Sequence, residues 1–582
     1  MRKLFVFIIL IIGLGVGLGF DLANKGLAWQ FAWSVTGEEE PISQIRGVIE
    51  WVGSGLRPQP NTQPMTPINN IGVPPYGINT FLALEADPRK VEAQLKTISD
   101  AGIVWIRQQF SWHDIEIDGR GQFTDSRHDR NGDGTPDTIS AWDKYDYMVD
   151  MAEKYGIRIQ ARLDTSPAWS RSNPDSDDLG PADDVQDFVN FAVAVAEHYQ
   201  GRIHHYQVWN EPNIFPEWGP RDVSPEGYTD MLCKTYTALK AVDPDIQVIT
   251  AALAPTVSLT GRDMNDFIFL QRMYDAGAGD CFDILSVQGY GLFSGPTDRR
   301  MRPTTTNIGR HIYIRDLMVA NGDADKPIWI SEAAWNFVPT VEENPNVTGI
   351  RNQFGQVTQG QAADYMVAYY QRAKEEWHWL GVINYWYFTR PDTVWENTPQ
   401  YYFRMAEPDF SDEHPYYTTL PVYEAVKDYI LTETPTLYTG VHQADNHWAI
   451  TYAPDTLVID DESAQFGKAT STDSISFNAH SYNSNGQLFV RWQGDSADIC
   501  VNDVCQAYSS TSNGWHTTLV GLIGDESLIT ITKTGVEPLV IDSITIIDRQ
   551  FENQWGIIVL GIIGGLMSII VILDILRGRA RD

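Results

Sequence analysis

Positive charge is scarce in this sequence. Its 582 residues include 42 lysines and arginines but 76 aspartates and glutamates, which gives a formal net charge of −34. A surface this acidic repels a phosphate backbone, so nucleic acid is excluded as a partner. The length exceeds that of an ordinary compact domain, so it predicts either one large domain or several domains.

Cysteine is scarce as well, and the four residues allow at most two disulfides. Cys500 and Cys505 are close enough in the sequence to clip a small hairpin. Cys233 and Cys281 could pair in space, or they could be buried thiols. An even number of cysteines outside the cytoplasm is compatible with disulfides in both pairs.

Long apolar runs are missing from the interior of the chain and occur only at its two ends. Two basic residues precede the run at 4–20, and three arginines follow the run at 555–573. Length and flanking charge predict an N-terminal membrane anchor or signal-anchor at 1–23 and a C-terminal transmembrane helix at 555–576. Both short tails would be cytoplasmic, and the bulk of the chain would lie outside the cytoplasm at the cell membrane. A buried core helix is the alternative for the second run.

Aromatic residues, in contrast, are abundant, with 19 Trp, 26 Tyr and 23 Phe. Aromatic faces suit sugar rings, whose axial C–H groups pack on a π surface. Large β-rich proteins also carry many aromatic residues, and composition alone favours this simpler interpretation.

Residues 24–75 are expected to form a stalk or linker, because the part from 57 to 75 is rich in Pro, Asn, Gln and Thr. A repeating pattern then begins. Eight apolar segments alternate with eight amphipathic segments at 76–432, which predicts a (β/α)8 TIM barrel of the α/β class. The expected strands lie at 76–82, 103–107, 157–163, 204–211, 246–253, 282–287, 327–331 and 382–388, and the expected helices at 88–101, 142–155, 185–199, 225–242, 267–274, 309–320, 361–373 and 421–430.

Helical periodicity ends near residue 435. Short alternating runs follow, for example at 447–452, 487–492 and 539–547, and Asn, Ser, Asp and Gly turns separate them. This pattern predicts an antiparallel β-sandwich at 435–550. The sandwich could bind carbohydrate, or it could be a spacer that packs on the barrel.

Two glutamates stand at the C-terminal ends of expected barrel strands, where TIM barrels place their chemistry. Glu211 follows the fourth strand and is held by the stiff turn at Pro212, whereas Glu332 ends the seventh strand. Two carboxyl groups about 5–5.5 Å apart are what retaining cleavage of a glycosidic bond needs. We expect Glu211 to be the acid/base, with a raised pKa, and Glu332 to be the nucleophile.

Polar and aromatic residues at other strand ends are candidates for binding the sugar. Arg107 would keep Glu332 ionised, because a cation among apolar residues needs a partner. Tyr290 could hydrogen-bond the nucleophile, and Asn210 could hold the sugar 2-hydroxyl. Aromatic platforms could form under or beside the sugar, although each ring could instead pack in the barrel wall. The candidates are Trp386, as a floor, and Trp112, Trp169 and Trp335.

Two motifs carry a family resemblance. Trp209-Asn210-Glu211-Pro212-Asn213 and Trp329-Ile330-Ser331-Glu332 resemble the acid/base and nucleophile motifs of the retaining clan A glycoside hydrolases. The chain is most similar to glycoside hydrolase family 39 and its bacterial exopolysaccharide-processing relatives, over about residues 76–430. Many relatives carry His-x-Tyr after the sixth strand, whereas this chain has Gln288-Gly289-Tyr290. A neutral amide still hydrogen-bonds a hydroxyl or a carboxylate, but it cannot titrate.

A further motif stands apart from the glutamate pair. Asp129, Asn131, Asp133 and Asp137 follow the D-x-N-x-D-G-x-x-D spacing of a calcium loop, in which alternate oxygens wrap a hard cation. The twelfth position, where such loops carry Glu, is Ser140. Calcium is therefore a candidate structural ion, and an ordinary polar surface loop is the alternative. The expected catalysis requires no cofactor.

Together these features predict a membrane-anchored, extracytoplasmic retaining glycoside hydrolase. It would cleave O-glycosidic bonds of a β-linked poly- or oligosaccharide by double displacement. A non-catalytic carbohydrate-binding protein and a structural surface protein are alternatives from other classes. A transglycosylase would share the first chemical step, so the sequence does not distinguish it from a hydrolase.

Overall fold

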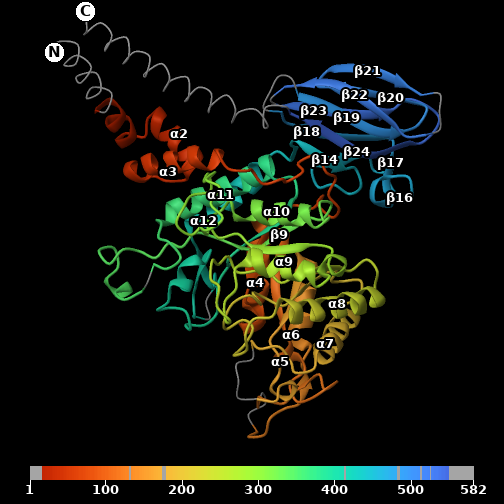
Figure 1. Ribbon diagram of the computed structural model, residues 1–582. Coiled ribbons are helices and arrows are strands. Elements are labelled where there is room, and N and C mark those ends of the chain that lie inside the picture. The colour runs from red at the N-terminus through yellow and green to blue at the C-terminus, as the bar shows by residue number, and fades with distance from the viewer. Residues whose placement is uncertain are drawn as a thin grey trace, which may run out of the picture.

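Eight parallel strands form the central sheet (Figure 1). This computed structural model describes residues 16–129, 133–173, 179–350, 352–411, 414–481, 486–510, 514–524 and 526–548. Within them the strands run in the order β7-β6-β5-β2-β1-β10-β9-β8. Parallel bridges from Ile249 to Ile284 and from Leu253 to Val287 join the two edges and close the barrel. The strands are β1 (Tyr76–Thr80), β2 (Trp105–Ser111), β5 (Arg158–Asp164), β6 (His205–Val208), β7 (Gln247–Ile249), β8 (Leu285–Gln288), β9 (Ile328–Ala333) and β10 (Leu380–Tyr385).

The helices around the barrel begin where the sequence provides caps. The Asp87 side chain accepts the backbone N–H of Arg89 at the start of α4, and the Ser224 side chain accepts that of Gly227 at the start of α8. A proline follows each cap, at a position where a helix needs no N–H donor. The helices that alternate with the strands are α4 (Pro88–Asp100), α6 (Asp143–Lys154), α7 (Val185–His198), α8 (Pro225–Val242), α9 (Asp266–Asp275), α10 (Arg310–Ala320), α11 (Gln359–Glu376) and α12 (Pro421–Thr432).

The floor of the barrel is aromatic, whereas the layer above it is polar. Trp105 and Trp329 meet edge to face with their ring centroids 5.2 Å apart, and His205 stacks on Trp329. Above this floor, Gln160 and Asn384 exchange hydrogen bonds of 3.2 Å across the barrel. The apolar floor closes the N-terminal end, so the polar side chains above it face the C-terminal ends of the strands.

The C-terminal part is a sandwich of two six-stranded sheets, counted over the described residues. Side chains alternate between core and surface, as in β19, where Leu488, Val490 and Trp492 are buried. The backbone N–H of Trp448 donates to the carbonyl of Gly72, just before β1 begins, at 3.0 Å. The sandwich therefore meets the barrel at the N-terminal ends of the strands (Figure 1). Its strands are β13 (Thr436–Leu437), β14 (Gly440–Gln443), β15 (Ile450–Tyr452), β16 (Leu457–Asp460), β17 (Lys468–Thr472), β18 (Ser474–Ala479), β19 (Gly486–Gln493), β20 (Ser496–Val501), β21 (Val504–Ser509), β22 (His516–Ile523), β23 (Ser527–Lys533) and β24 (Leu539–Ile547).

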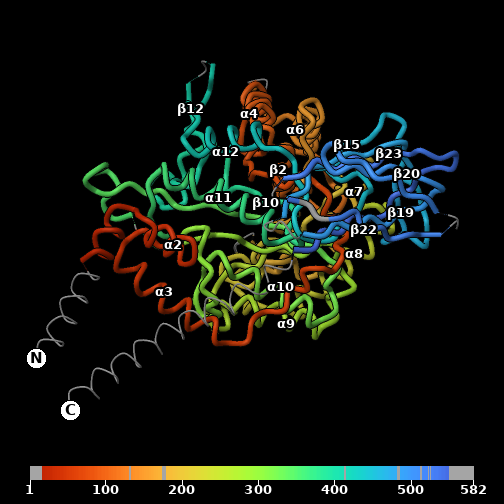
Figure 2. The backbone as a smooth tube through the Cα atoms, turned by 90° about the horizontal axis from the view of Figure 1, so that it is seen from above, coloured from red at the N-terminus to blue at the C-terminus, as the bar shows by residue number. Residues whose placement is uncertain are grey.

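Residues 24–75 differ from the expected stalk, because they contain two helices that pack on the barrel (Figure 2). α2 (Leu27–Thr36) and α3 (Pro41–Gly55) lie beside α11, where the Tyr365 hydroxyl donates to Glu39 at 2.7 Å. Gly37 ends α2 with a φ of 62°, and a Cβ there would lie 2.7 Å from the Gly295 carbonyl oxygen. Glycine is needed at this contact, both for its backbone angle and for the close approach.

Arg300 is the buried cation that links α2 to the barrel. It donates to both carboxylate oxygens of Asp298, at 2.8 and 2.9 Å, and to Glu38 at 2.7 Å. Its side chain is 3% exposed and that of Asp298 is fully buried. The composition of residues 24–75 gives no sign of this docking. Its contacts have partners more than 200 residues away, and such contacts leave no local pattern in the sequence.

The predicted transmembrane segment at each end is contradicted. Over the described residues, no helix is both long enough and apolar enough to cross a membrane. The run at 555–573 lies outside the described residues, as does the run at 4–20 up to residue 15. The cell-membrane location with two cytoplasmic tails rested on these segments, and it is corrected with them.

We expect Arg300→Met to destabilise the protein by about 3 kcal/mol, because Asp298 would keep a poorly compensated charge in a buried site. Thermal unfolding measures the loss, and limited proteolysis between residues 37 and 60 reports whether α2 and α3 leave the barrel. Lys96→Met is the control, because Lys96 pairs with Asp100 on an exposed face and its loss should leave the melting temperature nearly unchanged. Equal melting temperatures for the two variants would contradict the account.

Candidate active site

The chain turns sharply after β6 and places Glu211 at the C-terminal end of the barrel. The strand ends at Val208, earlier than expected, because Trp209 and Glu211 have left-handed φ values of 71° and 39°. Such angles cost a non-glycine residue about 1–3 kcal/mol and need support from the surroundings. The backbone N–H of Trp209 donates to the Leu163 carbonyl at 2.9 Å, and the backbone N–H of Glu211 donates to the Ala252 carbonyl at 3.0 Å. Neighbouring strands therefore hold the turn in place.

Asn213 fixes the far side of the same turn. Its amide donates to the carbonyl oxygens of Ala254 and Met264, at 2.9 and 3.0 Å, and its side-chain oxygen accepts the Ala254 N–H at 2.8 Å. The side chain is completely buried. The last residue of the Asn-Glu-Pro-Asn run is therefore structural, and it ties the turn that carries Glu211 to the segment after β7.

Glu332 occupies the next-to-last position of β9 and is surrounded by donors. Arg107 Nη1 donates to Glu332 Oε1 at 2.9 Å, and the Tyr290 hydroxyl donates to Glu332 Oε2 at 2.7 Å. The Arg107 and Glu332 side chains are 1% and 7% exposed. Burial raises the pKa of Tyr290 far above its ordinary value, and the charge of Glu332 adds to the effect, so Tyr290 remains a donor. Both oxygens of Glu332 are thus held by fixed partners.

Arg107 joins several strands through one guanidinium group. It lies within β2, which continues to Ser111, and not at a strand end as expected. Besides Glu332, it donates to Gln207, Asn79 and Asn210, at 2.6, 2.9 and 2.8 Å. Burial lowers the pKa of Arg107 to about 10, and the neighbouring charge of Arg162 contributes. Arg107 is therefore still a cation at neutral pH.

Glu211, in contrast, has a neutral neighbour. Gln288, the last residue of β8, donates its amide N–H to Glu211 Oε1 at 2.9 Å. Burial raises the pKa of Glu211 well above its ordinary value, and the charges of Glu332 and Glu217 raise it further. These surroundings favour the protonated form, which is the form that a general acid needs. The glutamine is neutral, so it brings no positive charge that would counter the shift.

Glu217 is a third carboxyl group at the site, and the sequence did not single it out. Asn210 Nδ2 donates to Glu217 Oε2 at 3.2 Å. Burial raises the pKa of Glu217 to about 7, although the charge of Arg162 acts in the opposite direction. No local signal marks this residue, because it is one acidic residue among 76 and lies six positions after Glu211, outside the motif.

The four candidate tryptophans divide into two groups. Trp386 follows β10 and, together with Asn79 and Arg107, lines a cavity of about 150 Å³. Trp169 is partly exposed and meets the ring of Trp112 edge to face, with the centroids 5.6 Å apart. Trp112 and Trp335 are fully buried. They stand beside Phe191 and Tyr365 in the core, which corrects their assignment as sugar platforms.

The calcium-like loop connects the short strands β3 (Thr124–Asp125) and β4 (Ile139–Ser140). The Asp129 side chain accepts the backbone N–H groups of Asp133 and Gly134, at 3.2 and 2.7 Å. Asn131 lies outside the described residues. Over the residues that are described, no group of three or more His, Cys, Asp or Glu side chains is arranged to hold a metal ion. Calcium binding at Asp129, Asn131, Asp133 and Asp137 stays a prediction.

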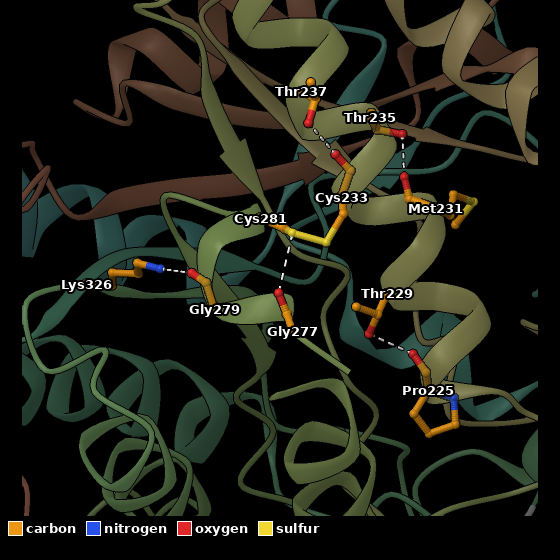
Figure 3. The surroundings of a disulfide bond; sticks show 10 residues. All are labelled: Pro225, Thr229, Met231, Cys233, Thr235, Thr237, Gly277, Gly279, Cys281 and Lys326. Carbon is orange, nitrogen blue, oxygen red and sulfur yellow. Dashed lines mark hydrogen bonds between the residues drawn. A yellow bond between two sulfur atoms is a disulfide. The ribbon is translucent and has the colours of Figure 1, made fainter. Parts of the chain in front are cut away.

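The four cysteines form two disulfides. Cys233 in α8 bonds to Cys281, the last residue of the short 3-10 helix η3 (Ala278–Cys281), and Figure 3 shows the two side chains pointing toward each other. Cys500 bonds to Cys505 across the turn between β20 and β21. The first bond ties the helix after β6 to the segment before β8, and the second closes a hairpin at the edge of the sandwich.

Glycoside hydrolases are the solved structures that this chain resembles, whereas no protein-family model and no curated protein matches it. A family 39 glycoside hydrolase from the gut symbiont Bacteroides cellulosilyticus WH2 has 15% identity and a TM-score of 0.42, over 82% of this chain and 83% of that one. A monomeric β-xylosidase from Caulobacter crescentus CB15 has 15% identity and a TM-score of 0.41, over 82% and 98%. A glucosidase from Croceicoccus marinus has 15% identity and a TM-score of 0.41, over 76% and 92%. Similarity at this level leaves the functional argument to the site itself.

We expect Glu211→Gln to melt at a higher temperature than the wild type, with a difference that grows as the pH rises above the ordinary pKa of a glutamate. The folded-state pKa of Glu211 is raised, so the folded protein binds this proton more tightly than the unfolded chain. The stability from this group is complete below its ordinary pKa and is lost as pH rises toward the raised value. Glutamine does not ionise and avoids the loss.

Melting temperature as a function of pH is the measurement. Glu226→Gln is the matched control, because Glu226 lies on α8 with its side chain 52% exposed, and its hydrogen bond with Arg272 lowers its pKa. Its effect should therefore be flat over the same range. If the Glu211→Gln difference were equally flat, Glu211 would not have the raised pKa that its surroundings indicate.

Proposed function

We propose that the protein is a retaining glycoside hydrolase, which cleaves O-glycosidic bonds of a β-linked poly- or oligosaccharide by double displacement. The observation that best supports this proposal is the unequal setting of the two carboxyl groups. Glu332 pairs with Arg107, whereas Glu211 meets a neutral amide and has a raised pKa. Double displacement requires one carboxylate that attacks and one carboxyl group that donates a proton.

In the first step, the Glu332 carboxylate attacks the anomeric carbon while Glu211 passes its proton to the glycosidic oxygen. The bond from the anomeric carbon to that oxygen breaks, and an ester bond to Glu332 forms. Arg107 and Tyr290 each hold one oxygen of Glu332, so the carboxylate is oriented before the sugar binds.

The second step uses the same two residues with Glu211 in the opposite role. The ester has no negative charge, and the charge of Glu332 is one of the causes that raise the pKa of Glu211. Glu211 is therefore a stronger acid once the ester has formed, and it serves as the base. It takes a proton from water, whose oxygen attacks the anomeric carbon and releases Glu332. These steps use protein carboxyl groups and water alone.

Two alternatives follow from the same site. A transglycosylase would use a sugar hydroxyl in place of water in the second step, and it would leave the first step unchanged. A carbohydrate-binding protein without activity would bind sugar at the same place. The paired carboxyl groups and their opposite surroundings favour the enzyme, because binding alone does not require one carboxylate beside a cation and one carboxyl group with a raised pKa.

Replacing each glutamate by alanine separates the two roles. We expect Glu332→Ala to lower kcat at least about 10³-fold on every substrate, because no carboxylate remains to attack. Glu211→Ala should retain turnover of aryl glycosides with good leaving groups and lose turnover of natural glycans, since only the latter need a proton donor. New reducing ends from β-linked polysaccharides and exopolysaccharide, and phenol release from aryl β-glycosides, measure these rates.

Azide rescue provides the stereochemical control for these two variants. In Glu332→Ala, azide should attack the anomeric carbon directly and give the α-glycosyl azide. In Glu211→Ala, it should attack the ester and give the β-glycosyl azide, and proton NMR distinguishes the products. Full activity of Glu332→Ala, or the same anomer from both variants, would contradict the assignment.

A further inference from the structure

Glu217 is attached to the strand tip at two points. The indole N–H of Trp209 donates to the Glu217 backbone carbonyl at 2.8 Å, and Asn210 Nδ2 donates to the Glu217 carboxylate at 3.2 Å. Trp209 is buried and packs against Trp218. The turn that positions Glu211 therefore also positions Glu217, and the two carboxyl groups belong to one rigid unit.

The orientation of the Asn210 amide is determined by Arg107. Arg107 Nη2 donates to Asn210 Oδ1 at 2.8 Å, and a flipped amide would bring its NH₂ group against the guanidinium. Nδ2 must therefore point the other way, toward Glu217. One of its two N–H groups reaches Glu217 Oε2. Within the described part of the chain, the second N–H of Asn210 and the Oε1 atom of Glu217 make no further hydrogen bond.

The charged groups around Glu217 are Arg162 and Asp164 on β5, Glu332 on β9, and Glu211 on the same turn. Arg162 and Asp164 pair at 2.7 Å, Glu332 accepts from Arg107 at 2.9 Å, and Glu211 accepts from Gln288 at 2.9 Å. The Asp164 carboxylate also accepts the Gln109 amide at 2.7 Å. These ionic groups thus have partners of their own, whereas Glu217 has only the amide of Asn210. Glu217 thus has one unused acceptor oxygen, and Asn210 beside it has one unused N–H donor. A hydroxyl group, which both accepts and donates, would complete both contacts.

We propose that Glu217 is a specificity-determining residue. Together with Asn210, it binds a free hydroxyl group on the carbon next to the anomeric carbon of the sugar. The second Asn210 N–H donates to the hydroxyl oxygen, and the hydroxyl O–H donates to the Glu217 carboxylate. The substrate class is therefore a sugar with an unsubstituted hydroxyl at that carbon. Sugars that carry hydrogen, an acetyl ester, a methyl ether or an acetamido group there have no hydroxyl, so they cannot form this pair of hydrogen bonds. This inference rests on the glycosidase function proposed above.

The test compares a nitrophenyl β-glycoside that the wild type turns over with its 2-deoxy counterpart. We expect Glu217→Ala to lower kcat/KM for the hydroxylated substrate about 10- to 100-fold, the loss of one hydrogen bond to a charged acceptor. The same variant should change kcat/KM for the 2-deoxy substrate less than about threefold. Glu217→Gln keeps an acceptor oxygen and should fall between. Glu226→Gln, an exposed change on the following helix, should leave the ratio unchanged.

The pH dependence of this ratio is a readout that a merely structural role would not move. The pKa of Glu217 is about 7, so its carboxylate is ionised above that pH and protonated below it. The wild-type preference for the hydroxylated substrate should therefore rise with pH through about 7, and it should be flat in Glu217→Gln. Titration of Glu211 affects both substrates and cancels in the ratio.

An unchanged ratio in Glu217→Ala, whether both substrates lose activity equally or neither does, would overturn the inference. Failure of the proposed function looks different, because the wild type would then release nitrophenol from neither substrate. In that case, calorimetric titration of the wild type and Glu217→Ala with the methyl β-glycoside and its 2-deoxy form replaces the kinetics. Selective weakening for the hydroxylated sugar supports the role of Glu217, and equal affinities, or no binding of the hydroxylated form to the wild type, overturn it.

Discussion

The buried positive charge of Arg107 is the constraint on which the rest of the site depends. One guanidinium group binds Asn79 on β1, Gln207 on β6, Asn210 on the turn after β6 and Glu332 on β9. A buried cation is stable only when its donors are satisfied, so these four side chains are held in one arrangement. The arrangement aims Glu332 at the barrel opening and turns the Asn210 amide toward Glu217. Removing the cation would leave Glu332, Glu211 and Glu217 to repel one another.

The molecule separates chemistry from support. The charged residues gather at the C-terminal ends of the barrel strands, whereas the aromatic floor and the sandwich occupy the opposite end. The sandwich therefore cannot supply residues to the candidate site, although it can still bind glycan at a distance. The segment of α2 and α3 contacts the loop that follows Tyr290. Just after α2, Glu38 pairs with Arg300, and Gly37 packs against Gly295. The two helices brace that loop from outside.

The sequence predicted the parts that leave a local pattern. Alternation of apolar strands with capped helices predicted the barrel. Glutamates at two strand ends placed Glu211 and Glu332 in one site, and their catalytic roles stay a prediction. Contacts over long range leave no such pattern, which is why the docking of α2 was missed. Glu217 was missed because a single glutamate in a loop carries no signal of its own. Trp112 and Trp335 were misplaced because a position near a strand end does not reveal whether a ring faces the opening or the core. The terminal spans were inferred from apolar length, and the described residues contain no helix that supports them.

The central claim is that Glu332, held by Arg107 and Tyr290, forms a covalent bond with the sugar. The most direct measurement is intact-protein and peptide mass spectrometry of the full chain after reaction with a 2-deoxy-2-fluoro β-glycoside carrying a good leaving group. Fluorine slows both steps, and the leaving group restores the first, so the ester accumulates. The account predicts a mass increase of one fluorosugar on the peptide that contains Glu332. A bond to any other residue, or release of the leaving group with no covalent intermediate, would contradict it.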